Sequence, residues 1–330
     1  MKPAFSVLLF TVLSGAGLGA LAIIALLDLA ALVGMIAPLA PPRLQARAAA
    51  IALLLVVAGL CASTLHLANP KNAWRSWTRW RTSWLSREAV LSLAFMPVAV
   101  GLVACWWWDV APTMRVLFAV ATLLLAWMIL VCTAMIYASL KPIRQWHTRH
   151  VPANFLLYGH ASGALLVVVV LRSDGYEAAS LVPLVWLVWL LFVAAAIGKL
   201  LYWRFLRSDK GAITLEQAIG VPRGVRPPPT PDAPASIMAA RLFDMGHAGG
   251  TFLTREFVIN VAARNRTWIV VLMWSFGFVL PMVWLALGLA RWQGAVLAML
   301  ACMIGMLAER WLFFADARHT VRLYHGEPTT

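Results

Sequence analysis

Eight long apolar runs alternate with short polar stretches along the chain. The runs cover residues 5–30, 46–66, 88–108, 114–139, 153–172, 181–203, 267–290 and 294–315. A helix of about 20 apolar residues spans the hydrocarbon core of a bilayer. Each run is continuous rather than alternating, which favours helices over the strands of a membrane barrel. The pattern therefore predicts an all-α membrane protein with eight transmembrane helices.

Composition supports this class. Hydrophobic residues make up 62% of the 330 residues and charged residues 12%, whereas soluble domains are about 45–50% apolar and about 25% charged. The first run follows Lys2 and begins like a signal peptide. Its apolar character continues to about Pro38, far beyond an ordinary signal sequence, so we expect it to remain uncleaved.

Lysine and arginine are distributed unequally between the two ends of the predicted helices. Both termini share one side with the loops 67–87, 140–152 and 204–266, and this side carries 22 of the 27 Lys and Arg residues when Lys199 and Arg310 are included. The positive-inside rule places this side in the cytoplasm of a bacterial inner membrane protein. The net charge of +14 lies at helix ends, which favours lipid headgroups or a docked protein over nucleic acid.

Two pairs of similar strings indicate an internal duplication. SWLSREAV (83–90) resembles TFLTREFV (251–258), and LLFTVLSGA (8–16) resembles LLYGHASGA (156–164). The matches relate the first predicted helix to the fifth and the third to the seventh, which favours two parallel four-helix units over a chance similarity.

The duplication gives a domain organisation. Residues 1–150 form the first four-helix unit, 151–203 the first two helices of the second unit, and 267–330 its last two helices and the tail. Residues 204–266 contain IGVPRGVRPPPTPDAPAS and are expected to form an extended, partly mobile Pro-rich strap on the cytoplasmic surface.

The segment STLHLANPKNAWRSWTRWRTSWLSREAV (63–90) holds the densest mixture of cationic and indole side chains. His66 ends the second predicted helix and Glu88 begins the third, so a short loop should bring both side chains to one interfacial depth. His titrates near neutral pH, and a partly desolvated Glu can relay a proton, so the pair suits proton-coupled chemistry. The alternatives are an interfacial hydrogen-bonding His66, and a Glu88 that follows a Ser86 cap and favours the helix dipole.

Indole and guanidinium groups dominate the loop between these two residues. The spacing of Trp74, Trp77, Trp80 and Trp84 predicts one face of an amphipathic helix in the headgroup region. The arginines between them suit lipid phosphates or a docked protein. SGAGLG, with Gly15 and Gly19 four residues apart, allows close helix packing, or it could line a narrow channel for a lipid tail.

Other motifs for cofactors are missing from the sequence. Cys61, Cys105, Cys132 and Cys302 stand singly within apolar runs without CxxC or CxxCH, so we interpret them as small apolar residues. His160 and His319 also stand singly, which favours packing or hydrogen-bonding roles. The sequence predicts no haem or metal in this chain.

Three segments carry a resemblance to a known family. KPAFSVLLFTVLSGAGLG (2–19), the His66–Glu88 motif and IYASLKPIRQWH (136–147) resemble the DmsC family, the membrane anchor subunits of dimethyl sulfoxide reductase and related molybdenum enzymes, including sulfite dehydrogenase complexes. The similarity covers all eight predicted helices and is strongest in the first half.

The resemblance implies a quinone- or quinol-reactive anchor without haem. The family docks an iron–sulfur subunit with four [4Fe–4S] clusters, which connects to a molybdopterin catalytic subunit, and its quinol-site His and Glu fall on His66 and Glu88. We expect Arg87 to tune the charge of this pair. The docking surface is expected to comprise Arg75, Arg79, Arg81 and the 140–150 loop with Arg144.

The direction of electron flow stays open at this stage. The Pro-rich strap and the end AERWLFFADARHTVRLYHG (308–326) look more like the sulfite dehydrogenase branch. A reductase anchor oxidises menaquinol, whereas an anchor in sulfite oxidation reduces quinone, and a cytoplasmic catalytic pair favours the second. The alternative functions are a secondary transporter with parallel repeats, for which Asp28 is the best candidate residue, and a purely structural membrane tether.

Overall fold

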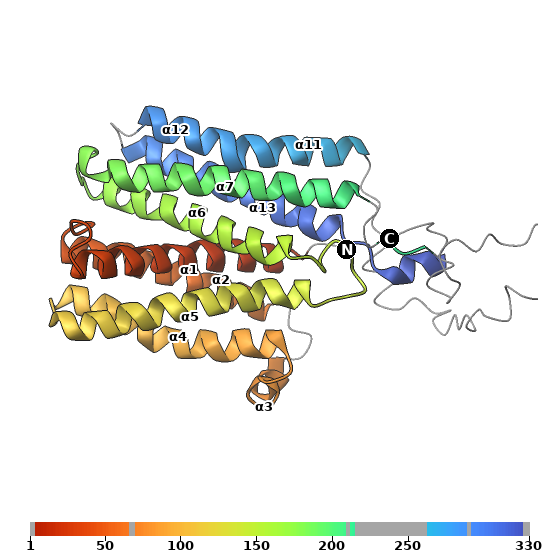
Figure 1. Cartoon of the computed structure of the whole chain (residues 1–330), viewed down its shortest axis with the longest axis horizontal. Helices are drawn as coiled ribbons and strands as arrows, with labels where there is room; N and C mark the ends of the chain where they lie inside the picture. Colours follow the sequence, from red (N-terminus) through yellow and green to blue (C-terminus); the bar gives the residue numbers. More distant parts are fainter. Residues whose placement is uncertain (1–3, 66–69, 209–211, 215–262, 289–291, 326–330) are drawn as a thin grey trace, which may run out of the picture.

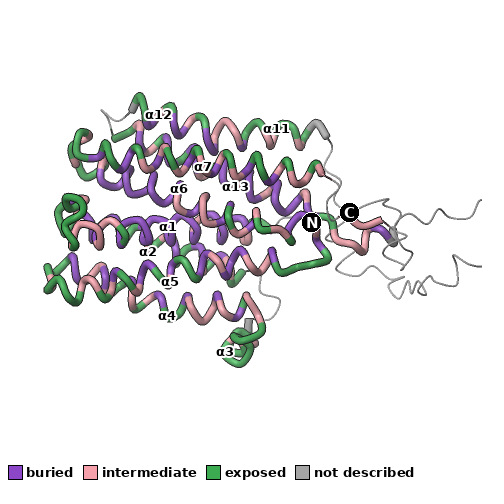
Figure 2. The backbone as a smooth tube through the Cα atoms, viewed as in Figure 1, coloured by how far each residue is buried: buried purple, intermediate pink, exposed green. Residues whose placement is uncertain are grey.

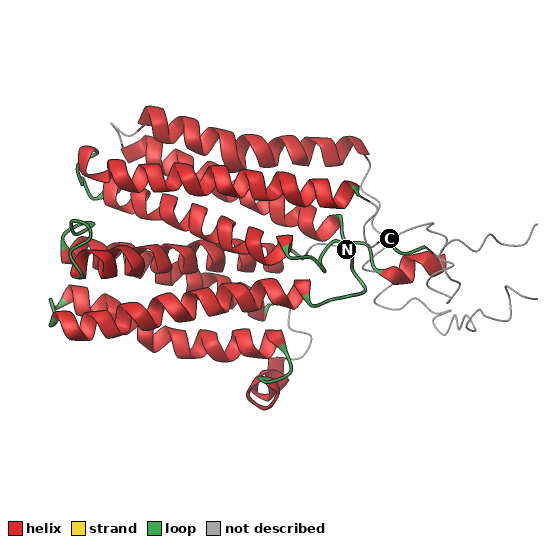
Figure 3. Ribbon diagram, viewed as in Figure 1, coloured by secondary structure: helices red, strands yellow, loops and turns green. Residues whose placement is uncertain are grey.

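The computed structural model describes residues 4–65, 70–208, 212–214, 263–288 and 292–325. Within these ranges the chain is built from helices joined by short loops (Figure 3). The long helices are α1 (Phe5–Leu32), α2 (Pro42–Thr64), α4 (Trp84–Trp107), α5 (Pro112–Ala138), α6 (His150–Ser173), α7 (Val182–Arg207), α11 (Ala263–Trp274), α12 (Leu280–Gly288) and α13 (Trp292–Ala315). Shorter elements are η1 (Pro70–Arg75), α3 (Ser76–Arg79), η2 (Ala179–Leu181), the π-helical turn η3 (Ser275–Val279) and η4 (Thr320–His325).

The eight predicted spans are confirmed. Eight segments of the described chain are long and apolar enough to cross a membrane. Six of them are α1, α2, α4, α5, α6 and α13; η2 and α7 together form another, and the last runs over Asn265–Leu287 through α11, η3 and α12. The chain is therefore an all-α, multi-span membrane protein.

Helices α1 and α6 form the centre of the bundle (Figures 1 and 2). Their most apolar windows are 78% and 83% buried inside the protein, whereas the outer helix α4 is only 33% buried. An apolar outer surface is the normal state of a helix that faces lipid. A Cβ added at Gly19 would collide with the carbonyl group of Gly159, and one at Gly163 would collide with the backbone of Ala20. The close-packing interpretation of the α1 glycines is confirmed at Gly19.

The two similar strings in α1 and α6 lie in this central contact. Gly15 and Gly19 approach Gly159, and Gly19 and Ala20 approach Gly163, so contacts advance in the same direction along both helices. The helices are therefore parallel. TFLTREFV lies outside the described residues, as does most of the Pro-rich strap, so the four-helix duplication and its domain limits stay predictions.

The start of α4 differs from the alternative in which Ser86 caps the helix. Ser83, rather than Ser86, is the N-cap residue: its hydroxyl accepts a hydrogen bond of 3.3 Å from the backbone N–H of Ser86. Ser83 has the extended backbone that a cap requires. Glu88 consequently lies in the second turn of α4 rather than the first, where the attraction of the helix dipole is weaker.

The predicted single amphipathic helix with four tryptophans is also wrong. Residues 70–79 form the 3₁₀ segment η1 followed by the single turn α3, and Trp84 already belongs to α4. Trp74, Trp77 and Trp80 are 62%, 58% and 49% exposed, as expected for indoles at the headgroup level of a bilayer. The prediction failed because a spacing of three and four residues fits several short turns as well as one helix.

Candidate functional site

Glu88 is a buried carboxyl group near one end of the bundle. Only 4% of the residue is exposed. The hydroxyl group of Thr133 on α5 hydrogen-bonds to its Oε1 atom, and no basic side chain of the described chain forms an ion pair with it. A charged carboxylate without a counter-ion is costly in an apolar interior. The site therefore suits a group that gains and loses a proton during function.

The second predicted site residue, His66, lies outside the described residues. Helix α2 ends at Thr64, with Leu65 as its C-cap, so His66 follows directly after the end of that helix. Helices α2 and α4 are in contact, as predicted from the short loop that joins them.

An apolar cavity opens along the seam between α4 and α5. Its volume is about 470 Å³, within the range of roughly 300–1,000 Å³ that is typical of small-molecule sites. Arg87 and Cys132, the sequence neighbours of Glu88 and Thr133, contribute to its wall. The full lining is Trp80, Trp84, Arg87, Val90, Leu91, Trp127, Met128, Val131 and Cys132. We call it the α4–α5 cavity.

Arg87 fixes the loop that leads into α4. Its guanidinium donates hydrogen bonds of 3.0 Å to the carbonyl oxygen of Trp80 and 2.6 Å to that of Arg81, and it lies 4.2 Å from the centre of the Trp84 ring. These contacts hold Trp80 and Trp84, two tryptophans that line the cavity. The guanidinium makes no ion pair with Glu88.

His160 positions the indole on the α5 wall of the cavity. Trp127 Nε1 donates to His160 Nε2 at 2.9 Å, and His160 Nδ1 lies 2.7 Å from the carbonyl oxygen of Leu156. Since an indole N–H only donates and a carbonyl oxygen only accepts, the imidazole is neutral and carries its proton on Nδ1. The predicted hydrogen-bonding role of His160 is confirmed.

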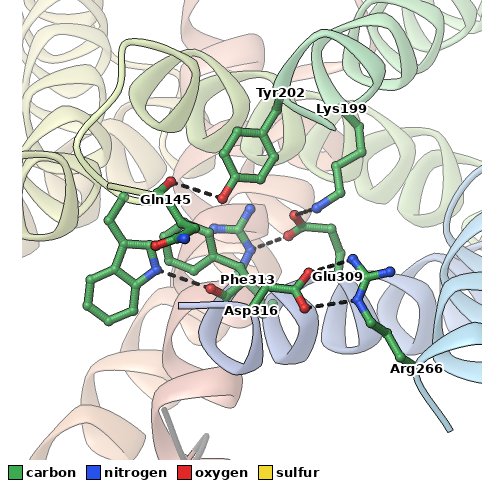
Figure 4. A network of polar contacts seen from close by, with 9 residues as sticks. Gln145, Lys199, Tyr202, Arg266, Glu309, Phe313 and Asp316 are labelled. Atoms are coloured by element: carbon green, nitrogen blue, oxygen red, sulfur yellow. Dashed lines mark hydrogen bonds and ion pairs between the residues drawn. The ribbon is translucent and has the colours of Figure 1, made fainter. Parts of the chain in front are cut away.

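A second buried carboxyl group, Glu309 on α13, lies at the same end of the bundle. Lys199 Nζ lies 2.6 Å from Glu309 Oε1, and Arg310 Nε lies 2.6 Å from Glu309 Oε2. The exposed side-chain fractions of Lys199 and Glu309 are 1% and 2%. Figure 4 shows these two side chains pointing toward one another. We call these three residues the α7–α13 cluster. Its net formal charge is +1.

Further polar contacts tie the α5–α6 loop to this cluster's surroundings (Figure 4). Tyr202 on α7 donates a hydrogen bond of 3.0 Å to the carbonyl oxygen of Gln145, and Trp146 Nε1 donates one of 3.1 Å to that of Phe313. Arg266 on α11 and Asp316 form a bidentate pair with distances of 3.0 and 2.8 Å. The loop and the ends of three helices are therefore held in one arrangement.

Comparisons with known proteins agree with this membrane architecture. The model of the DMSO reductase anchor subunit (DmsC) family matches residues 1–315. The chain belongs to the DmsC family. It is 35% identical to the C subunit of sulfite dehydrogenase from Allochromatium vinosum over 98% of this chain and 99% of the relative. It is 28% identical to the C component of anaerobic dimethyl sulfoxide reductase from Escherichia coli over 36% of this chain and 42% of that relative. No solved structure matches.

The predicted docking arginines of this DmsC family member occupy different settings. Arg75, Arg79 and Arg81 are exposed, and the guanidinium groups of Arg75 and Arg81 lie 5.8 and 5.6 Å from the rings of the preceding tryptophans. Arg144 instead donates a 3.2 Å hydrogen bond to the carbonyl oxygen of Phe205 and a second one to that of Ser208. It joins the α5–α6 loop to the end of α7.

The α7–α13 cluster was not predicted as a site. Lys199 and Arg310 count with the loop cations in the charge asymmetry although both fall within predicted helices, and both are buried. A signal was available, because an ionisable residue inside an apolar run is a functional or pairing candidate.

Two other predictions on single residues have clear outcomes. Asp28, the transporter candidate, lies 3.3 Å from Arg115 in an ion pair at the far end of the bundle, and His319 accepts a hydrogen bond from the backbone N–H of Val321, as expected.

No group of three metal-ligating side chains is assembled within the described residues. The four cysteines are free thiols, and Cys61 alone is exposed.

Proposed function

We propose that this chain is the quinone-reactive membrane anchor of a molybdopterin oxidoreductase complex. It exchanges electrons and protons between the quinone pool and a four-cluster iron–sulfur subunit, which connects to a molybdopterin catalytic subunit. The observation that carries the proposal is Glu88, which is buried and has no counter-ion among the described residues; its sequence neighbour Arg87 lines an apolar cavity at the end of a membrane helix.

The residues around the α4–α5 cavity fit a quinone. An aromatic ring with an isoprenoid tail needs an apolar, partly aromatic cleft that opens towards lipid, and Trp80, Trp84 and Trp127 supply aromatic walls. Reduction of a quinone to quinol takes up two electrons and two protons. In the proposal His66 hydrogen-bonds to one ring oxygen and exchanges a proton with it, and Glu88 relays the other proton.

The family relatives favour sulfite oxidation with quinone as the electron acceptor. The similarity to the sulfite dehydrogenase relative extends over the whole chain, whereas the match to the dimethyl sulfoxide reductase relative covers about a third of it. In this direction electrons pass from the iron–sulfur subunit to the quinone. The excess of cations at the ends of the helices supports a cytoplasmic position for the termini, the site and the partner subunits.

Docking of the iron–sulfur subunit is assigned to the exposed arginines beside the cavity mouth. Arg75, Arg79 and Arg81 lie on the short segment that precedes α4. Their charge suits an acidic protein surface, and their position would bring a cluster of that partner close to the quinone. Arg144 supports this surface by holding the neighbouring α5–α6 loop.

The experiment is electron transfer in the purified complex with His66→Ala. Because His66 is proposed to bind the quinone ring, the quinone-linked rate should fall roughly 100-fold, the scale of one acid–base group. Dye-linked activity of the catalytic subunit should stay at the wild-type value. An unchanged quinone-linked rate would remove the site assignment and leave a structural tether.

A further inference from the structure

A small cavity lies between α1, α5, α6 and α13. Its volume is about 20 Å³, and a space of roughly 10–15 Å³ on this measure holds one water molecule. Thr133, the hydrogen-bond partner of Glu88, lines it on one side, and Arg310 of the α7–α13 cluster lines it on the other. The full lining is Thr11, Val12, Ser14, Gly15, Ala16, Leu130, Thr133, Phe155, Tyr158, Gly159, Ser162, Met306 and Arg310.

Two buried polar atoms among the lining residues have no hydrogen-bond partner within the part of the chain that the structure describes. They are the hydroxyl group of Tyr158 and the Nη1 atom of Arg310, and each residue is 5% exposed. Unpaired buried donors are rare in folded proteins. Both belong to side chains in contact, since the Arg310 guanidinium lies 5.2 Å from the Tyr158 ring centre. Each could donate to one water molecule in the cavity.

The remaining hydroxyl groups of the cavity can accept from that water. Ser14 donates to the carbonyl oxygen of Phe10 at 2.6 Å, and Ser162 donates to that of Tyr158 at 2.6 Å. Each serine oxygen therefore keeps lone pairs for the cavity. A water molecule with two donors and at least one acceptor around it has the partners that buried waters require.

The polar groups lie at similar depth in the bundle. Glu88 is the fifth residue of α4, and Arg310 is five residues before the end of α13, which corresponds to roughly 6–8 Å along each helix at 1.5 Å per residue. Tyr137, one turn after Thr133, lies within electrostatic range of both the Glu88 carboxyl and the Arg310 guanidinium. The ring of Tyr137 packs 5.4 Å from that of Phe313 on α13.

Other charged groups near Glu88 are accounted for. On its own helix, Arg87 is bonded to loop carbonyls. On α5 the titratable groups that interact electrostatically with Glu88 are Cys132 and Tyr137. Across the cavity, Arg310 lines the wall, and the carboxylate of Glu309 lies between Arg310 and Lys199.

We propose that one water molecule in this cavity links Thr133 to Tyr158 and Arg310, and that through it the net positive α7–α13 cluster compensates the charge of Glu88 whenever Glu88 has released its proton. This inference rests on the proposed quinone site. When the O–H bond of Glu88 breaks, its proton forms an O–H bond with a quinone oxygen that has received electrons from the partner subunits. The Thr133 hydroxyl then donates to the carboxylate and accepts from the water. Arg310 keeps its proton throughout and orients the water, so it is a positioning residue.

The test uses the opposite charges of neighbouring cluster residues. In the purified complex, the pH profile of the quinone-linked rate is measured for Arg310→Gln, which leaves a neutral cluster, and for Glu309→Gln, which leaves a charge of +2. Glu88→Gln identifies the limb of the profile that belongs to Glu88. Less positive charge disfavours the carboxylate, so its midpoint should move to higher pH in Arg310→Gln and to lower pH in Glu309→Gln. A buried unit charge should move it by roughly half a pH unit or more.

A milder pair of variants tests the water itself. Tyr158→Phe removes a proposed water donor and should move the midpoint to higher pH by a smaller amount. Tyr202→Phe removes a buried hydroxyl that donates to Gln145 instead and should leave it unchanged. If Arg310→Gln and Glu309→Gln do not assemble, Tyr158→Phe and Tyr202→Phe provide the test. Equal midpoints of the pH profile in these two variants would overturn the proposal.

The outcomes separate the two proposals. If the midpoints of Arg310→Gln and Glu309→Gln move in the same direction, or if neither moves, the water link is overturned. The quinone site still stands in that case, provided that Glu88→Gln loses the part of the pH profile assigned to Glu88. A wild-type profile in Glu88→Gln overturns the quinone site and the water link with it. Dye-linked activity serves as the assembly control in every variant.

Discussion

Two glutamates lie buried in the same end of this bundle, and their surroundings are opposite. Glu309 has a lysine at 2.6 Å and an arginine at 2.6 Å, whereas among the described residues Glu88 has only the hydroxyl group of Thr133 as a partner. A carboxylate held by two cations stays ionised and fixes helices α7 and α13 to each other. A carboxyl with a single neutral partner can change its protonation at much lower cost. The difference indicates a structural role for Glu309 and a proton-exchanging role for Glu88.

The comparison predicts its largest effect on stability at Glu309. Replacing Glu309 by Ala leaves Lys199 and Arg310 as unpaired buried cations, which should lower the free energy of unfolding by roughly 3–5 kcal/mol. Glu88→Ala leaves no unpaired buried cation and should lower the free energy of unfolding clearly less. Thermal unfolding of the detergent-solubilised protein measures both, and equal losses would show that the pairing of Glu309 is not what holds the helices.

Replacing all three charged residues of the α7–α13 cluster should lower the free energy of unfolding less than removing Glu309 alone. In Lys199→Met/Glu309→Leu/Arg310→Met all three buried charges are gone, and apolar side chains of similar length fill the space. Since buried ion pairs add little net stability over apolar packing, most of the loss in Glu309→Ala should be regained. Thermal unfolding again provides the measurement. A triple variant as unstable as Glu309→Ala would contradict the electrostatic explanation.

A smaller effect is expected at the hydrogen bond of Glu88. Thr133→Val removes the partner of a buried carboxyl at nearly constant volume and should cost roughly 1–2 kcal/mol. Thr122 is a matched control on the same helix, since its hydroxyl is buried and has no hydrogen-bond partner in the described ranges. Thr122→Val should be neutral or slightly stabilising, and equal unfolding temperatures for the two variants would argue against a formed Thr133–Glu88 bond.

The smallest effect on the chain itself is expected at the exposed arginines. Substituting Arg75, Arg79 and Arg81 by Gln should leave thermal unfolding unchanged, because exposed side chains contribute little. Retention of the iron–sulfur subunit during purification should instead fail at lower salt concentration than in the wild-type complex. If the variant loses the iron–sulfur subunit at the same salt concentration as the wild-type complex, these arginines do not form the docking surface.

The fold was largely predictable, because hydropathy reports helix length and number directly. All eight spans follow from apolar runs, and the burial of α1 follows from its small residues. The cap at Ser83 was missed because Ser83 and Ser86 both fit a capping position, and only the backbone distinguishes them. The broken segment at residues 70–79 was missed because its spacing also fits a helix.

The site was predictable only in part. The sequence singles out Glu88 as an ionisable residue at a helix start, but its partner Thr133 lies 45 residues away along the sequence. Lys199 and Arg310 resemble ordinary cations at helix ends, and their burial depends on how α7 and α13 pack. Pairings between distant helices follow from tertiary structure, which periodicity does not encode. His66 stays a prediction, since it lies outside the described residues.

The most direct test of the quinone site is Glu88→Gln in the complete complex, with Glu177→Gln as a matched change at an exposed carboxyl in the loop between α6 and α7. Quinone-linked and dye-linked electron transfer are measured side by side. The proposed role predicts a loss of roughly 100-fold in the quinone-linked rate of Glu88→Gln, with dye-linked activity unchanged and Glu177→Gln at wild-type values. A quinone-linked rate in Glu88→Gln equal to that of Glu177→Gln would contradict the role of Glu88 in quinone chemistry.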